Sequence, residues 1–250
     1  MGIFDSTFSD EAKRMAIESD KPNAFASFAK STSLPKAISE RHVACVFLLD
    51  ISGSMHRGDA ITKLNEGMQK FKEYMQSDSR IADVVDVAII TFGSTVTILQ
   101  DFTPVSEMSV PVLTANGQTP LGEALTKGME LLNKRKEVYK TTGTPYFRPW
   151  IFCITDGVPT DDWHDAAIKL KQAEDSNKVI ARCVCIENDP NFSKTEIKQI
   201  FSPGRILKLE NLDFNGLFEF VSNSLTAVSQ STPGETKINV AVPNTISLEI

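Results

Sequence analysis

Short uninterrupted apolar runs alternate along the chain with segments whose apolar residues repeat every three or four positions. The first run, VACVFLLD, ends abruptly at Asp50. An apolar run of this kind is typical of a strand that is buried on both faces of a parallel sheet. The sequence predicts such strands at residues 43–50, 83–92, 149–156, 179–186 and 205–209.

The segments between these strands have the apolar spacing of amphipathic helices. Pro120 suits the first turn of one helix, and Asp162 can cap another. The clearest apolar stripe consists of Ile61, Leu64, Met68, Phe71 and Met75. The sequence predicts helices at residues 61–75, 119–139, 163–177, 214–228 and, as a short one, near Thr195.

Alternating strands and helices predict an α/β fold with a doubly wound, mostly parallel sheet and helices on both faces. Gly93-Ser94, followed by TVTIL, predicts a hairpin turn into an antiparallel edge strand. Ligands of such sheets bind at the carboxyl ends of the strands. Asp50 and Asp156 both fall at that end of a predicted strand, so they are candidate functional residues on position alone.

Length and composition fit one domain with a short extension at each end. The chain has 250 residues, of which 41% are hydrophobic and 23% charged, enough to bury a sizeable core. We predict the domain over residues 41–229. Residues 1–40 are predicted to be an extension that packs on the domain or on a partner. Residues 230–250 are predicted to be a tail that ends in a loose strand or is disordered.

Charge and cysteine usage narrow the class of partner and the compartment. A net charge of -6 argues against nucleic acid or an anionic membrane as the main partner. The N-terminus lacks the charged segment followed by an apolar segment that marks a secretory signal. No apolar stretch approaches the ~20 residues that span a bilayer. Each cysteine lies inside an apolar run, which predicts buried reduced thiols and a cytoplasmic protein. The cysteines are Cys45, Cys153, Cys183 and Cys185.

The triplet Asp50, Ser52 and Ser54 follows the first strand directly. Alternate residues of a loop that leaves a strand point the same way, so three oxygens can converge on one point. One carboxylate with neutral hydroxyls suits a hard cation such as Mg²⁺ or Mn²⁺, with Ca²⁺ as a third choice, and does not suit zinc. The alternative is a polar turn that makes only local backbone hydrogen bonds.

Two further segments extend this triplet: Thr119 precedes a helix in GQTPLGEAL, and Asp156 follows a strand in TDG. In this order, the three segments resemble the von Willebrand factor A (VWA) family over roughly residues 41–229. The resemblance implies a metal-ion-dependent adhesion site in which Ser52, Ser54 and Thr119 bind the cation through hydroxyls. Asp50 and Asp156 would bind it directly or through water. The family fold also implies a six-stranded sheet with one antiparallel edge strand.

A cation held by hydroxyls and water-bridged carboxylates keeps much of its charge and an open coordination position. The resemblance therefore implies a cation-dependent protein-binding module, not an enzyme, that recognises an acidic group of a partner protein. The segments TANGQTPLGEAL and TDGVPTD are most similar to those of bacterial VWA proteins from tellurite-resistance and related stress or defence systems. The typical partners of those proteins are kinases and phosphatases. The alternative within the family is a VWA subunit that serves an AAA+ ATPase in a remodelling or metal-insertion complex.

An enzyme of a different class is a third hypothesis. Asp50 could be the nucleophile of a metal-dependent phosphohydrolase, with Asp156, Asp161 and Asp162 as metal carboxylates. Ser52 stands where such enzymes usually carry a second aspartate, so Asp50 would lack a partner acid. The histidines add no metal motif. His42 and His164 are predicted to be structural or solvated, and His56 is a candidate for the rim of the cation site.

Overall fold

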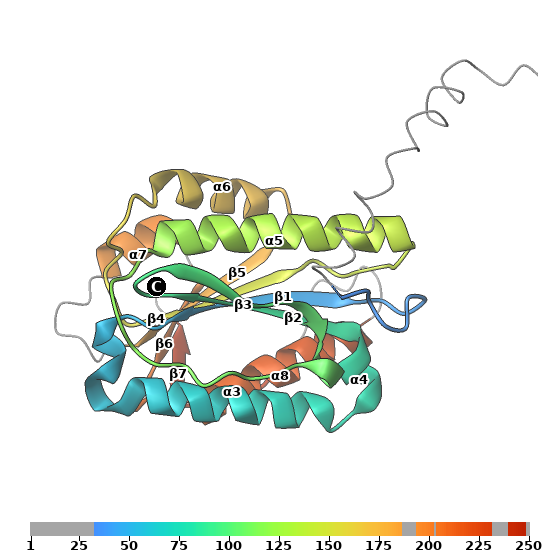
Figure 1. The fold of residues 1–250 in the computed structure, drawn as a ribbon, viewed down its shortest axis with the longest axis horizontal. Helices are drawn as coiled ribbons and strands as arrows, with labels where there is room; N and C mark the ends of the chain where they lie inside the picture. Colours follow the sequence, from blue (N-terminus) through green and yellow to red (C-terminus); the bar gives the residue numbers. More distant parts are fainter. Residues whose placement is uncertain (1–32, 187–193, 203, 232–239, 249–250) are drawn as a thin grey trace, which may run out of the picture. The chain divides into compact units, whose positions relative to one another are not determined.

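The computed structural model describes residues 33–186, 194–202, 204–231 and 240–248. From Leu34 onward, the described residues form one unit around a seven-stranded sheet with the strand order β3-β2-β1-β4-β5-β6-β7 (Figure 1). The predicted N-terminal extension lies almost entirely outside the described residues. The predicted domain boundaries therefore stay predictions.

The five central strands are parallel, as their apolar runs predict. All eight residues of β1 are buried, because helices cover both faces of the sheet. The edge strands β3 and β7 are antiparallel to their neighbours β2 and β6. The strands are β1 (Val43–Asp50), β2 (Val85–Phe92), β3 (Val96–Pro104), β4 (Trp150–Thr155), β5 (Ile180–Ile186), β6 (Ile206–Leu209) and β7 (Ile246–Leu248).

Helices cover the sheet in two layers, each with its own apolar core (Figure 1). One layer consists of α5 (Leu121–Thr142), α6 (His164–Asp175) and α7 (Lys194–Ile200). The other consists of α3 (Ala60–Gln76), α4 (Ser79–Val84) and α8 (Phe214–Gln230), with the short 3-10 helices η2 (Gly53–Asp59) and η3 (Val105–Glu107) beside it.

Close packing joins α3 to α8 in the second layer. A Cβ atom on Gly67 would lie 2.6 Å from the Phe218 ring, so the glycine lets the two helices approach. The rings of Phe47, Phe71 and Phe218 meet over the middle of β1, with centroids 5.1 to 6.0 Å apart. Aromatic packing of this kind fixes the helix pair on the sheet.

The doubly wound fold class is confirmed, and the sheet has one strand more than the six expected. The additional strand, β7, pairs Ile246 with Leu209 at the edge of β6. It lies at the end of the predicted C-terminal tail, where it confirms the loose strand that was one of the two alternatives. At three residues, β7 is too short to give a clear periodic signal. The predicted hairpin is present, but its loop comprises residues 93–95, one residue more than the expected two-residue turn at Gly93-Ser94.

A buried polar cluster lies at the amino-terminal ends of β1 and β2. The carboxylate of Asp86 accepts hydrogen bonds from His42 Nδ1, at 2.8 Å, and from the Tyr139 hydroxyl. Arg135 Nη2 lies 2.9 Å from the same oxygen, and all four side chains are buried. His42 also donates from Nε2 to the Lys36 carbonyl at 2.6 Å. His42 is therefore structural, as predicted.

The cysteines agree with the expectation of buried thiols. All four cysteines are buried and free. No helix in the described part of the chain has the length and apolar character needed to cross a bilayer.

Candidate metal centre

The pairing of β1 with β4 places two acidic strand ends side by side. The strands run parallel with Leu49 opposite Ile154, so Asp50 and Thr155 leave the sheet together and Asp156 follows. The chain after β1 also bonds to the loop before α5, because Asn116 N–H donates to the Ile51 carbonyl at 2.6 Å. Three loops that are far apart in sequence thus meet at the carboxyl ends of the central strands β1 and β4.

Asp50 is fully buried, and both of its carboxylate oxygens accept hydrogen bonds. Oδ1 accepts from the Ser52 backbone N–H at 2.7 Å, and Oδ2 accepts from the Thr155 hydroxyl at 2.6 Å. Burial raises the pKa of Asp50 to about 7; the hydrogen bonds from Ser52 and Thr155 oppose this rise, and the nearby charge of Asp156 adds to it. A bound cation would offset the cost of keeping this carboxylate charged.

A chain of short oxygen contacts links the first loop to the third. The hydroxyls of Ser52 and Ser54 lie 2.9 Å apart, and the Ser54 hydroxyl donates to Asp156 Oδ1 at 2.6 Å. Ser52 and Asp156 are buried, whereas Ser54 is half-buried and reaches the surface. The polar-turn alternative accounts for the Asp50–Ser52 bond but not for the contact between loops 102 residues apart.

Thr119 brings the second loop to the same place. Its side chain is buried, and a Cβ atom on Gly157 would lie 2.7 Å from its hydroxyl oxygen. Residue 157 therefore has room only for glycine beside the Thr119 hydroxyl, directly after Asp156. The five predicted ligand positions are thus contiguous in space.

The loop after β4 holds Thr119 in place. Thr119 N–H donates to the Thr160 hydroxyl, and Thr160 N–H donates to the Thr119 carbonyl, both at 3.0 Å. Asp161 accepts from the N–H groups of Gly122 at 3.0 Å and Glu123 at 2.8 Å. Asp161 therefore caps the start of α5 from a different part of the chain.

The predicted capping roles divide between two aspartates. Asp162 accepts from His164 N–H at 3.1 Å, as expected for the start of α6. Asp161 serves α5 instead, which local sequence could not indicate. Thr155 and Thr160 are site residues that the sequence analysis missed; the only available signal was their place beside Asp156 and Asp161 in TDGVPTD.

Gly117 allows the second loop to approach the hairpin between β2 and β3. Its φ angle is +91°, and a Cβ atom there would lie 2.1 Å from the Ser94 nitrogen. Its carbonyl accepts from Gly53 N–H in the first loop at 3.0 Å. Both the positive φ and the close contact require glycine.

The oxygen donors fit a hard divalent cation. Two carboxylates and three hydroxyls are the ligand types that Mg²⁺ and Mn²⁺ prefer, and no sulfur or imidazole is among them. The described ranges hold no group of three or more His, Cys, Asp or Glu side chains that could bind a metal, and the candidate site itself has two carboxylates, with hydroxyls as its other donors. His56, the candidate rim residue, is exposed in η2, two residues after Ser54. His164 is exposed and lies 2.8 Å from Asp162.

Residues 45–158 match the family model of the von Willebrand factor type A domain. This stretch contains all five predicted ligand positions. The comparison with curated proteins gives no match.

Solved structures show the same fold at low sequence identity. The pilus adhesin SpaC of Lactobacillus rhamnosus GG has a TM-score of 0.60 at 17% identity, over 75% of this chain and 31% of its own length. The vWF domain of the type V pili tip protein Mfa5 of Porphyromonas gingivalis has a TM-score of 0.56 at 11% identity, over 79% of this chain and 99% of that domain structure. Manganese-loaded TRAP protein of Plasmodium vivax has a TM-score of 0.51 at 20% identity, over 72% and 71%.

This chain spans less than a third of SpaC, so its likeness to that adhesin concerns one domain. Sheet order, helix layers and the match over residues 45–158 agree with one another. Over residues 45–158 the chain is therefore similar to the von Willebrand factor type A domain, and its described residues have the same doubly wound fold.

Proposed function

We propose that Asp50, Ser52, Ser54, Thr119 and Asp156 bind one divalent cation, Mg²⁺ or Mn²⁺, with Ca²⁺ as a third choice. The observation that carries the proposal is the contact of Ser54 with both Ser52 and Asp156, which brings oxygens from two loops to one point. The buried position of Asp50 supports it further, because a cation would balance a carboxylate that burial disfavours.

The cation would serve to recognise an acidic group of a partner protein. Neutral hydroxyls donate little charge, so the ion stays strongly electropositive, and half-buried Ser54 marks the side that faces solvent. The SpaC neighbour is described as a pilus adhesin and the TRAP neighbour as manganese-loaded, which accords with this use of the fold.

A binding role suits Asp50 better than a catalytic one. A nucleophile needs a free oxygen that faces its substrate, whereas both Asp50 oxygens accept hydrogen bonds and the side chain has no exposed surface. A cytoplasmic location, a stress-resistance or defence system and a kinase, phosphatase or ATPase partner remain predictions from the sequence.

A titration of the full chain with Mn²⁺ tests the metal site. Binding is monitored as the loss of the electron paramagnetic resonance signal of free Mn²⁺. We expect one site in the wild type and at least roughly tenfold weaker binding in Thr119→Val and Asp156→Asn. Thr144→Val is the matched control, because Thr144 is also buried but follows the far end of α5. Equal binding by all four proteins would refute the site.

The partner claim needs a separate measurement. Proteins retained from a lysate of the source organism are compared with Mg²⁺ and with EDTA, for the wild type, Thr119→Val and Thr144→Val. A partner retained by the wild type and Thr144→Val only with Mg²⁺ supports recognition through the cation. A partner retained in every lane would show that another surface binds it.

A further inference from the structure

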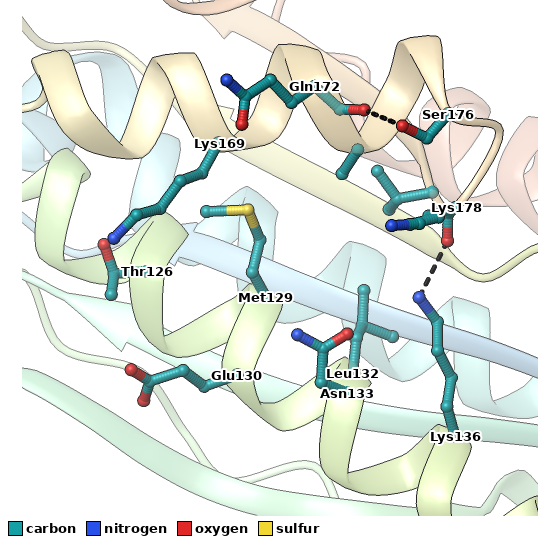
Figure 2. Close-up of a pocket in the computed structure, with 12 residues that line it drawn as sticks. Thr126, Met129, Glu130, Leu132, Asn133, Lys136, Lys169, Gln172, Ser176 and Lys178 are labelled. Atoms are coloured by element: carbon teal, nitrogen blue, oxygen red, sulfur yellow. Dashed lines mark hydrogen bonds between the residues drawn. The ribbon is translucent and has the colours of Figure 1, made fainter.

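A groove of about 570 Å³ lies between α5 and α6, in the helix layer on one face of the sheet (Figure 2). None of its lining residues is among the five candidate metal ligands. Its volume falls in the range of small-molecule sites, about 300–1,000 Å³. Any ligand of this groove would therefore be separate from the cation.

Three lysines line the groove, against one acidic residue. Lys136 comes from α5, Lys169 from α6, and Lys178 from the loop that leads to β5; Glu130 is the acid. Figure 2 shows Lys169 and Lys178 on opposite sides of Met129, while Glu130 extends away from Lys178. None of the three lysines forms an ion pair with a described residue, although the whole chain carries a net charge of -6. The groove is thus a positive site on an acidic protein.

Lys136 is held in position within the groove. Its ammonium donates to the Lys178 carbonyl at 2.9 Å. Burial lowers the pKa of Lys136, and the positive charges of Lys178 and Lys140 lower it further. The repulsion is relieved when an anion sits between the ammonium groups.

The floor of the groove is apolar. Leu132 and Val179 are buried there, and Met129 and Ala173 are partly buried beside them. Met129 lies in the middle of the view, between the two helices (Figure 2). A flexible thioether accommodates flat or irregular apolar groups. Hydroxyl and amide groups of Thr126, Asn133 and Gln172 provide further hydrogen-bonding partners at the edges.

We propose that this groove binds a small phosphorylated organic molecule of the nucleoside phosphate class. The phosphate groups lie against Lys136 and Lys178, since lysine binds phosphate as a point charge. The apolar or aromatic part packs on Met129 and Leu132. This inference is independent of the cation site.

ATP binding to the full chain, measured by calorimetry in EDTA so that no cation takes part, tests the proposal. We expect saturable binding with one site, weakened roughly tenfold or more in the double variant Lys136→Gln/Lys178→Gln. Lys134→Gln is the matched control, because Lys134 is an exposed lysine of the same helix that does not line the groove. Binding to this control should stay within about twofold of the wild type.

Binding of tripolyphosphate and of adenosine, measured in the same way, separates the contribution of the lysines from that of the apolar floor. Weaker binding of both than of ATP supports use of both the lysines and the apolar floor. Tripolyphosphate that binds as tightly as ATP would overturn the organic part of the proposal and leave a phosphate site. Absence of ATP binding at millimolar concentration, or equal weakening by Lys134→Gln, would overturn the groove as a site altogether.

Discussion

The Ser54 hydroxyl donates to Asp156 Oδ1 at 2.6 Å, across 102 residues of sequence. The two side chains come from loops after β1 and β4, which are neighbours in the sheet. The Ser54 hydroxyl contacts both the Asp156 carboxylate and the Ser52 hydroxyl, so these three oxygens are close enough together for one cation to bind them. This contact is the basis of the first prediction.

Ser54→Ala should weaken Mn²⁺ binding roughly tenfold, with a moderate loss of stability. Half-buried Ser54 gives up one hydrogen bond to a charged group, so the free energy of unfolding should fall by about 1–2 kcal/mol. Mn²⁺ titration and urea unfolding measure the two effects. Ser77→Ala, which removes an exposed hydroxyl bonded to the Tyr74 carbonyl, is the control and should leave metal affinity unchanged. A large loss of stability without a change in affinity would contradict the prediction.

Asp161→Ala should affect both α5 and the metal site. The substitution leaves the N–H groups of Gly122 and Glu123 without their carboxylate, which costs about 0.5–2 kcal/mol of unfolding free energy. It also loosens the loop beside Thr119, so Mn²⁺ should bind more weakly. The comparison is with Asp162→Ala, which removes the partner of the His164 backbone N–H and ring at the exposed start of α6. Equal metal affinity in the two variants would mean that Asp161 serves only the helix.

Gly117→Ala should disrupt the second loop. The new Cβ meets the Ser94 nitrogen, and the φ of +91° is unfavourable for alanine, so the cost should exceed about 1 kcal/mol and metal binding should weaken. Gly143→Ala is the matched control, because Gly143 has a φ of +70° but nothing within 4 Å of its Cβ position. Thermal unfolding and Mn²⁺ titration of both variants separate backbone strain from the clash.

The Asp86 cluster predicts a loss of stability in acid. Burial alone would raise the pKa of Asp86, but the hydrogen bond from His42 and the charge of Arg135 outweigh it, and the pKa is lowered. Stability from this group is therefore fully present above the unfolded-state pKa of about 4 and is lost as the pH falls below it, through the folded pKa. Urea unfolding between pH 2 and 7 should show this fall.

Asp86→Asn should remove part of that acid dependence. It should also cost about 3–5 kcal/mol at neutral pH, because Arg135 is left buried without its charged partner. The exposed residue Asp175 gives the control, and Asp175→Asn should keep the wild-type profile. A wild-type profile in Asp86→Asn would place the acid-sensitive group elsewhere.

The strong periodic signals predicted the fold well, and the weak ones did not. The central strands and long helices lie within a few residues of their predicted positions, since apolar runs and stripes are dictated by burial on the sheet. The three residues of β7 gave only a weak signal, so the sequence left a loose strand and disorder as alternatives there. The Asp86 cluster was missed because its partners lie far from Asp86 in sequence, His42 just before β1 and both Arg135 and Tyr139 in α5, and meet it only in the folded chain.

The residues of the candidate site likewise fall into two groups, those that the sequence pattern indicated and those that it did not. Asp50 and Asp156 were recognisable because each ends an apolar run, and the Ser52–Ser54 alternation follows one of them. Thr155, Thr160 and Asp161 act across loops, through hydrogen bonds to Asp50, Thr119 and α5. Bonds between distant segments leave no spacing in the sequence, so these residues could not be assigned from it.

The helix α5 is held at both ends. Asp161 fixes its first turn beside Thr119, and Arg135 and Tyr139 fix its last turns to the buried Asp86 carboxylate. Its 22 residues make a rod of about 33 Å between these anchors. The second loop is therefore shaped before any ligand arrives. Little ordering entropy is lost at Thr119 when a cation binds, so the affinity of the site depends mainly on the chemistry of its oxygens.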